Sequence, residues 1–105
     1  DTGCPYITHY DMWRELCYFV KYCGVTPAFA LYSATLLNAK LAKIDSFTGS
    51  VEKGKCADII VCVKNPLEDL SALRNLDMVI KEGYIIENPR PKKMPECEKE
   101  LDKFL

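Results

Sequence analysis

Histidine is almost absent from this sequence, since His9 is the only one among 105 residues. A serine–histidine–aspartate triad needs a histidine with positioned partners, and a histidine-rich metal site needs several. The chain therefore cannot build either kind of site from its own residues, and an active site of that type would require residues from elsewhere.

The sequence also lacks an excess of one charge and a long apolar run. Fourteen Lys and Arg balance fifteen Asp and Glu, with a net charge of −1. Nucleic-acid-binding proteins usually carry a basic stripe, so we expect no nucleic-acid partner. No apolar run reaches the ~18 residues of a membrane span, and no signal peptide opens the sequence. We expect no membrane partner and a cytoplasmic location. Residue 1 is Asp rather than Met, so we also expect that the chain was trimmed or cut from something longer.

Cysteine is too sparse and too badly placed for a disulfide framework. Six cysteines in 105 residues fall below the ~8–10% of a disulfide scaffold. Cys17 and Cys23 lie six residues apart on an expected helix and do not face each other. Cys62 lies in an apolar run where cysteine acts as a small hydrophobic residue. We expect reduced, mostly buried thiols.

Periodicity predicts two helices in the first half of the chain. A helix over 11–23 has an apolar stripe at helical spacing, with Gly24 placed to end it and Arg14 away from the stripe. The stripe consists of Met12, Leu16, Phe19, Val20 and Cys23. Thr26 and Pro27 then open a second helix that continues to Leu41, with Thr as the N-cap and Pro at the first helical position.

Short strands follow in the second half. An apolar strand is expected over 57–63, a helical turn over 67–73, and a hairpin of strands 76–81 and 84–87 joined at Glu82-Gly83. The tail from Asn88 contains three prolines and then a charged, solvated end, 96–105, with helical character. Helices followed by strands, without βαβ alternation, indicate the α+β class.

Two local patterns could suggest chemistry. Asp1, Cys4 and His9 offer three types of metal ligand in one loop, but there is no close cysteine pair and no fourth ligand, so the spacing alone favours an ordinary loop. A small zinc-stabilised domain is one alternative that this pattern leaves open. Lys53-Gly54-Lys55 lacks the glycine-rich frame and following helix of a phosphate-binding loop, and is typical of a solvated turn.

Several motifs, in order and nearly without gaps over residues 1–87, resemble the C-terminal end of the metal-dependent amidohydrolases, most closely the imidazolonepropionase-like and Xaa-Pro or Xaa-Lys dipeptidase-like branch. The motifs are Thr26-Pro27-Ala28, Ala34 to Leu41, Gly49-Ser50-x-Glu52-x-Gly54-Lys55-x-Ala57-Asp58, Asn65-Pro66-Leu67-Glu68-Asp69 and Val79 to Gly83. The resemblance implies a parent with a (β/α)8 barrel beside a β-sandwich built from both chain ends. It also implies hydrolysis of C–N bonds in a small amide or dipeptide substrate.

The same resemblance implies roles for two residues. Asp1 of Asp1-Thr2-Gly3 corresponds to the aspartate at the end of the last barrel strand, which binds the divalent metal, most often zinc, and moves a proton between metal-bound water and the leaving nitrogen. His9 corresponds to a histidine near the substrate, and Tyr10 stands where the family usually has glycine. The Gly54-Lys55-x-Ala57-Asp58 segment is expected to be structural.

The other metal ligands of the family are not in this sequence. The resemblance therefore implies a fragment in three parts. Residues 1–44 would hold the active-site loop, the last barrel helix and a linking helix, 45–88 the C-terminal strands of the sandwich, and 89–105 a charged tail. We expect this chain alone to be inactive, to bind no metal by itself, to partner the remainder of the enzyme, and to self-associate through exposed strands. A stand-alone binding or scaffold module derived from the sandwich is the alternative.

Overall fold

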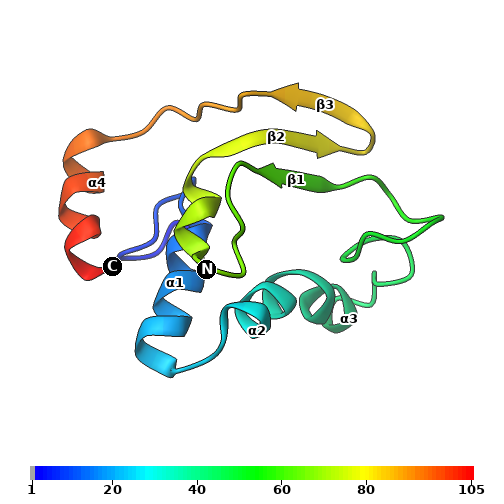
Figure 1. The fold of residues 1–105 in the computed structure, drawn as a ribbon, viewed down its shortest axis with the longest axis horizontal. Coiled ribbons are helices and arrows are strands. Elements are labelled where there is room, and N and C mark those ends of the chain that lie inside the picture. The colour runs from blue at the N-terminus through cyan, green and yellow to red at the C-terminus, as the bar shows by residue number, and fades with distance from the viewer. Residues whose placement is uncertain (1) are drawn as a thin grey trace.

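The computed structural model describes residues 2–105 as a group of helices beside a three-stranded antiparallel sheet (Figure 1). Helices come first and strands follow, which is the predicted α+β arrangement. The elements in chain order are α1 Met12–Cys23, α2 Pro27–Tyr32, the π-helical turn η1 Ser33–Leu37, α3 Asn38–Leu41, β1 Ile59–Cys62, the 3₁₀ helix η2 Leu70–Arg74, β2 Leu76–Lys81, β3 Tyr84–Glu87, α4 Pro95–Leu101 and the 3₁₀ turn η3 Asp102–Phe104.

Helix α1 has nearly the predicted bounds but buries a different face. Gly24 ends it in the left-handed conformation, with φ of 69°, as expected for a C-terminal glycine. Within the predicted stripe, Leu16 is buried and Val20 is half-buried, but three members are exposed, namely Met12, Phe19 and Cys23. Trp13 and Arg14 are buried instead. The stripe prediction is wrong at these positions in this chain, because α1 places Trp13 and Arg14 inward instead, where Arg14 contacts Glu98 of α4 and Asp102 of η3.

The second predicted helix is present as three joined segments, α2, η1 and α3. Thr26 caps it as predicted, since its Oγ1 accepts a hydrogen bond from the Phe29 backbone N–H at 3.1 Å. The π-helical turn interrupts the regular spacing in the middle. Ala30 and Ala39 are buried on the two flanking segments, so small residues allow close packing here, as the sequence indicates.

The sheet has the order β1-β2-β3, with both pairs antiparallel. Strands β2 and β3 have the predicted ends, and β1 is shorter than the predicted strand over 57–63. Glu82 and Gly83 both have positive φ, at 51° and 84°. This pair of left-handed residues is the type I′ geometry that matches the twist of a two-residue hairpin.

The tail returns from the sheet to the helices. After β3 the chain crosses to the far side of α1, where α4 and η3 pack (Figure 1). Helical character is confirmed, but the expectation of a fully solvated end is wrong, because Glu98 is only 7% exposed. Two arginines surround this carboxylate, which explains its burial.

The hydrophobic core is small and the surface is large for the mass. Leu16, Ala30 and Leu70 form the buried cluster, where α1, α2 and η2 meet. The solvent-accessible surface is 7520 Å², whereas a complete folded monomer of this mass exposes about 6,000 Å². The radius of gyration is 14.2 Å against about 13 Å for a compact domain of this length. The chain thus leaves roughly 1,500 Å² more surface uncovered than a self-contained domain.

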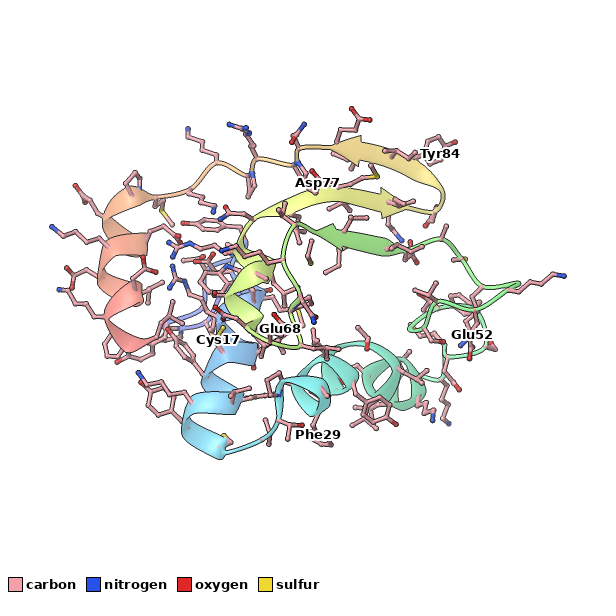
Figure 2. All side chains as sticks on the ribbon, in the orientation of Figure 1. Cys17, Phe29, Glu52, Glu68, Asp77 and Tyr84 are labelled. Carbon is pink, nitrogen blue, oxygen red and sulfur yellow. The ribbon has the colours of Figure 1, made fainter. Side chains whose placement is uncertain are left out.

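Large apolar side chains account for part of this surface. Phe29 on α2 and Tyr84 on β3 point outward on opposite sides of the molecule (Figure 2). The expectation of mostly buried thiols is also wrong, since three cysteines are exposed and three are half-buried. The small core of this chain contains no cysteine among its buried residues. No helix in residues 2–105 is long and apolar enough to cross a membrane.

Candidate functional site

The loop of residues 2–10 carries the predicted site and is folded into a tight turn. The Gly3 backbone N–H donates to the Ile7 carbonyl at 2.9 Å, and the Ile7 N–H donates to the Cys4 carbonyl at 3.1 Å. Ile7 is the buried residue of the loop. Tyr6 has φ of 72°, a left-handed conformation that costs energy for a residue with a side chain and persists only when its surroundings hold it.

His9 lies directly against Gly3. A Cβ atom built on Gly3 would be 2.6 Å from His9 Cε1 and 2.9 Å from His9 Nδ1, and Gly3 also has a positive φ of 84°. Only glycine fits this position without moving the imidazole. The turn therefore brings the exposed His9 side chain beside the backbone two residues after Asp1. Asp1 itself, predicted as the catalytic and metal-binding residue, lies outside the described residues.

Asp11 and Arg14 anchor this loop to the first turn of α1. Both side chains are fully buried. Asp11 accepts hydrogen bonds from Trp13 Nε1 at 3.0 Å and from Arg14 Nε at 2.9 Å. Burial alone would raise the pKa of Asp11, but hydrogen bonds involving Glu98, Arg14, Thr8 and Trp13 outweigh it and hold the pKa below its ordinary value. Asp11 is therefore a charged anchor for the loop.

Arg14 continues into a cluster with the tail. Its Nη2 lies 3.1 Å from Glu98 Oε2 and its Nη1 lies 2.7 Å from Asp102 Oδ1. Arg74, from η2, contacts the same two carboxylates at 2.8 and 3.0 Å. Both guanidinium groups also lie near the Trp13 ring, at 4.6 and 5.2 Å from its centre. We call these five charged residues, Asp11, Arg14, Arg74, Glu98 and Asp102, the arginine cluster.

The cluster shifts the protonation of Arg14, Arg74 and Asp102 toward the charged forms. Burial opposes ionisation of Asp102, but hydrogen bonds from Arg74 and Arg14 lower its pKa. Burial likewise opposes the charge on Arg14 and Arg74, and the carboxylates raise the pKa of both. Sequence reasoning missed this cluster because its members come from distant segments. The available signal was a set of four carboxylates in the tail, Glu96, Glu98, Glu100 and Asp102.

The residues that the structure describes do not form a metal site. Among residues 2–105, no three His, Cys, Asp or Glu side chains come together in a way that could hold a metal ion. The ligand set of Asp1, Cys4 and His9 includes the one residue outside this range. Described residues therefore supply at most part of a metal centre.

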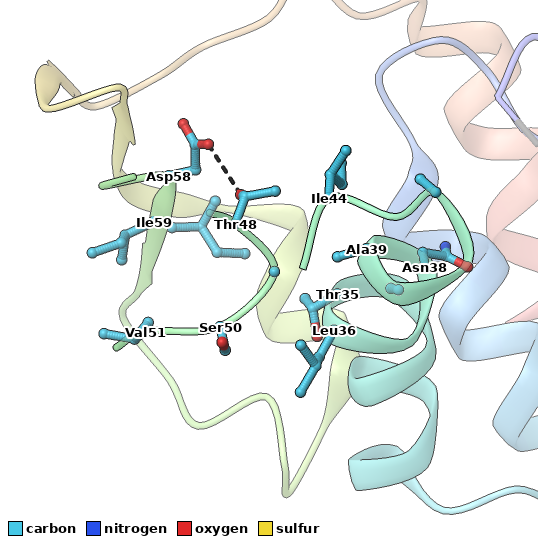
Figure 3. Close-up of a pocket in the computed structure, with 14 residues that line it drawn as sticks. Thr35, Leu36, Asn38, Ala39, Ile44, Thr48, Ser50, Val51, Asp58 and Ile59 are labelled. Carbon is cyan, nitrogen blue, oxygen red and sulfur yellow. Dashed lines mark hydrogen bonds between the residues drawn. The ribbon is translucent and has the colours of Figure 1, made fainter. Parts of the chain in front are cut away.

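An open cavity of about 770 Å³ lies between α3 and β1, away from the loop of residues 2–10 (Figure 3). Asp58 is the ionisable residue in its lining, and it already accepts hydrogen bonds from Thr48 Oγ1, Lys81 Nζ and the Glu82 N–H. The Glu82 N–H and then Lys81 lower the pKa of Asp58. Asp58 thus ties β1 to the hairpin, which is a structural role.

Gly49, in the same motif, packs against the helix beside this cavity. A Cβ atom there would lie 2.5 Å from the Ala39 Cβ, and φ is 93°. The glycine is therefore needed for close approach between the loop and α3. We assign the motif to packing rather than to catalysis.

Comparison with known proteins places these features in a family. A model of the amidohydrolase family matches residues 2–86, in agreement with the resemblance over residues 1–87. An imidazolonepropionase from Picrophilus torridus is 45% identical over 42 residues, which are 40% of this chain and 11% of that protein.

Two crystal structures are similar at higher coverage. A protein from Bifidobacterium longum, provisionally assigned as a prolidase, superposes with a TM-score of 0.92 at 43% identity, over 98% of this chain and 25% of its own. A Xaa-Pro dipeptidase with methionine bound in its active site has a TM-score of 0.71 at 41% identity, over 77% of this chain and 20% of its own. The chain spans a quarter or less of each of these proteins.

Proposed function

We propose, from the premise that this chain belongs to the amidohydrolase family, that it is the C-terminal part of a metal-dependent hydrolase that cleaves C–N bonds in dipeptides. The observation that carries the proposal is the TM-score of 0.92 with a provisionally assigned prolidase over 98% of this chain, at 43% identity. Fold alone does not establish activity, so the proposal also needs the site residues and the surface to agree with it.

The uncovered surface supports a larger parent protein. An excess of roughly 1,500 Å² on one side of an interface exceeds the ~800 Å² that each partner contributes to a standard complex. It is of the size found in obligate contacts. We assign residues 1–44 to the end of a (β/α)8 barrel with a linking helix, 45–88 to a β-sandwich shared with the N-terminal part of the chain, and 89–105 to a tail.

Within this parent, Asp1 is the proposed catalytic carboxylate and His9 the proposed substrate-binding residue. The exposure of His9 and its contact with Gly3 support this assignment, because they put an accessible imidazole close in sequence and space to the residues that follow Asp1. Residues 2–105 contain no group of three His, Cys, Asp or Glu side chains that could hold a metal ion. The proposed divalent cofactor, zinc, would need Asp1 and further ligands from the remainder of the enzyme, and we derive no reaction step through it.

Dipeptides are favoured over cyclic amides as substrates. The two crystal structures described above are of a provisionally assigned prolidase and a Xaa-Pro dipeptidase, and they match more of this chain than the imidazolonepropionase does. Substrate specificity in barrel enzymes comes from the other loops of the barrel. We therefore propose dipeptides as the substrate class and the cytoplasm as the location of the enzyme. Which dipeptides it cleaves is a question for assays of individual substrates.

The first test is the intact mass of the native polypeptide that contains this sequence. A mass several times 11.9 kDa is expected, and a mass near this value would instead support a stand-alone binding or scaffold module. The full-length protein should hydrolyse Xaa-Pro dipeptides, lose activity with a chelator and regain it with zinc. The 105-residue chain alone should show no turnover.

The role of Asp1 is tested by Asp1→Asn in the full-length protein. Loss of a general acid–base group should lower kcat by roughly 10²–10⁴-fold. Asp77→Asn is the matched control, because Asp77 is an exposed aspartate on β2, far from the loop in sequence. Equal activities for the two variants would contradict the assignment of Asp1, and no dipeptide hydrolysis by the wild-type protein would contradict the proposed reaction.

A further inference from the structure

The tail beyond β3 lies outside the segment that the amidohydrolase family model matches, which ends at residue 86. It nevertheless runs back across the molecule to the loop of residues 2–10, next to α1 (Figure 1). The tail therefore adds contacts to the candidate site that the matched segment does not contain.

Two contacts join the tail directly to this loop. The Met94 backbone N–H donates a hydrogen bond to the Tyr10 hydroxyl oxygen at 2.9 Å. The Phe104 ring meets the Tyr6 ring edge-on, with 5.5 Å between ring centres, a favoured aromatic geometry. These contacts lie on either side of His9 in the sequence.

The loop conformation depends on such support. Tyr6 has a left-handed backbone, which is strained for a residue with a side chain, and the Phe104 contact holds the ring of this same residue. Tyr10 immediately follows His9, so its hydroxyl fixes the backbone on which the imidazole is carried. The two tail contacts restrict the loop on both sides of the proposed substrate-binding residue.

Ion pairs of the arginine cluster hold the tail against α1 and η2. Glu98 of α4 and Asp102 of η3 both contact Arg14, which is fully buried, and Arg74. A second, separate contact lies at the end of η3, where the Tyr22 hydroxyl donates to the Phe104 carbonyl at 2.8 Å. The tail is thus held to α1 independently of its contact with Tyr10.

From these contacts we infer that the tail, residues 89–105, is a clamp that positions the His9 loop, and that Tyr10 is the positioning residue through which it acts. This inference rests on the proposed function only in giving His9 a substrate to bind. Tyr10 does not touch the substrate in this account. It restricts the backbone next to a residue that does, and small displacements of a binding group are costly in an enzyme site.

The test is Tyr10→Phe in the full-length protein, which keeps the ring and removes the hydroxyl acceptor. Loss of one neutral hydrogen bond should raise the opening equilibrium of loop 2–10 by about fivefold, measured by hydrogen exchange of its amides. Because His9 is assigned to substrate binding, KM for a dipeptide should rise by about the same factor while kcat changes less.

Tyr84→Phe is the matched control. It makes the same chemical change on β3, at a side chain that is 79% exposed and belongs to neither the loop nor the tail. Exchange in loop 2–10 and KM should stay at wild-type values in this variant.

The outcomes separate the clamp from the proposed reaction. If Tyr10→Phe leaves exchange in loop 2–10 unchanged, or if Tyr84→Phe changes it equally, the clamp is refuted. Faster loop exchange with an unchanged KM also refutes it, because the loop would then move without affecting His9. If the wild-type protein hydrolyses no dipeptide, the proposed function fails, and exchange in loop 2–10 alone decides whether Tyr10 holds the loop.

Discussion

Replacing Arg14 with glutamine is the most severe test of how the tail is held. Arg14 is completely buried and contacts three carboxylates, of which Asp11 is completely buried and Glu98 nearly so. The variant keeps a side chain of similar length but removes the positive charge. Arg74 remains, but it contacts only Glu98 and Asp102, and its side chain is 28% exposed.

The magnitude follows from the buried charges that lose their partner. Breaking a buried ion pair from one side typically costs about 3–5 kcal/mol, because the remaining charge stays buried without compensation. At about 1.4 kcal/mol per factor of ten, the tail should open roughly 10² to 10^3.5 times more often. Arg74→Gln should cost only about 1 kcal/mol, since Arg14 still serves both carboxylates and the site is partly exposed.

Hydrogen exchange of the α4 amides in the full-length protein measures this opening. Adding Asp11→Asn to Arg14→Gln should slow the opening at least about tenfold, because Asp11 is the buried carboxylate that Arg74 does not contact, and the second change removes its uncompensated charge. Effects of Arg14→Gln and Arg74→Gln that differ by less than about threefold would refute the reasoning, as would a double variant that opens faster than Arg14→Gln alone.

Three further predictions follow from the same structure. The pKa values of Asp11 and Asp102 are lowered in the folded chain, so the stability they give is complete above their unfolded pKa and is lost as pH falls below about 4. The opening equilibrium of α4 in the full-length protein, measured by hydrogen exchange corrected for the intrinsic pH dependence of amide exchange, should increase below that pH and stay constant between pH 5 and 7. Gly3→Ala should displace His9 and lower the proposed dipeptidase activity of the full-length protein. Gly54→Ala, with a similar φ of 92° and nothing within 4 Å of an added Cβ, should cost about 1 kcal/mol of stability and leave KM unchanged. The 105-residue chain made alone should self-associate through its exposed strands, and lysine at Ile60 or Ile86 should lower the average mass seen by light scattering toward 11.9 kDa; a monomer before any substitution would contradict this last expectation.

Features set by neighbouring residues could be predicted from the sequence. The hairpin at Glu82-Gly83 has its predicted ends because the two-residue turn alone fixes the register of both strands. The predictions that Thr26 caps the second helix and that Gly24 ends α1 are confirmed, because each depends on residues within one helical turn. The π-helical turn Ser33–Leu37 left no such signal, because its residues are ordinary helix formers.

Features set by distant residues could not be predicted. Arg14 was expected away from the buried stripe because helical periodicity considers only the helix itself, whereas its burial depends on Glu98 and Asp102. The same limit applies to the candidate site. His9 and Asp1 were identified by resemblance to a family, and the contact between His9 and Gly3 needed the structure.

The exposed part of the predicted stripe on α1 is explained by the short length of this chain relative to the proteins that it matches. Met12, Phe19 and Cys23 have the spacing of a buried helix face, yet they are exposed in a chain that spans a quarter or less of its relatives. The apolar stripe of a helix is usually buried over its full width. One part of this stripe, at Leu16 and Val20, already packs against α2 and η2. We therefore expect the exposed part to be covered by the barrel that we propose for the full-length protein, so that the periodicity predicted the burial of α1 in the proposed parent rather than in this chain. Hydrogen exchange cannot test a side-chain contact of this kind, but labelling of Cys23 can: the thiol should react rapidly in the isolated chain and slowly in the full-length protein, and equal rates would contradict this account.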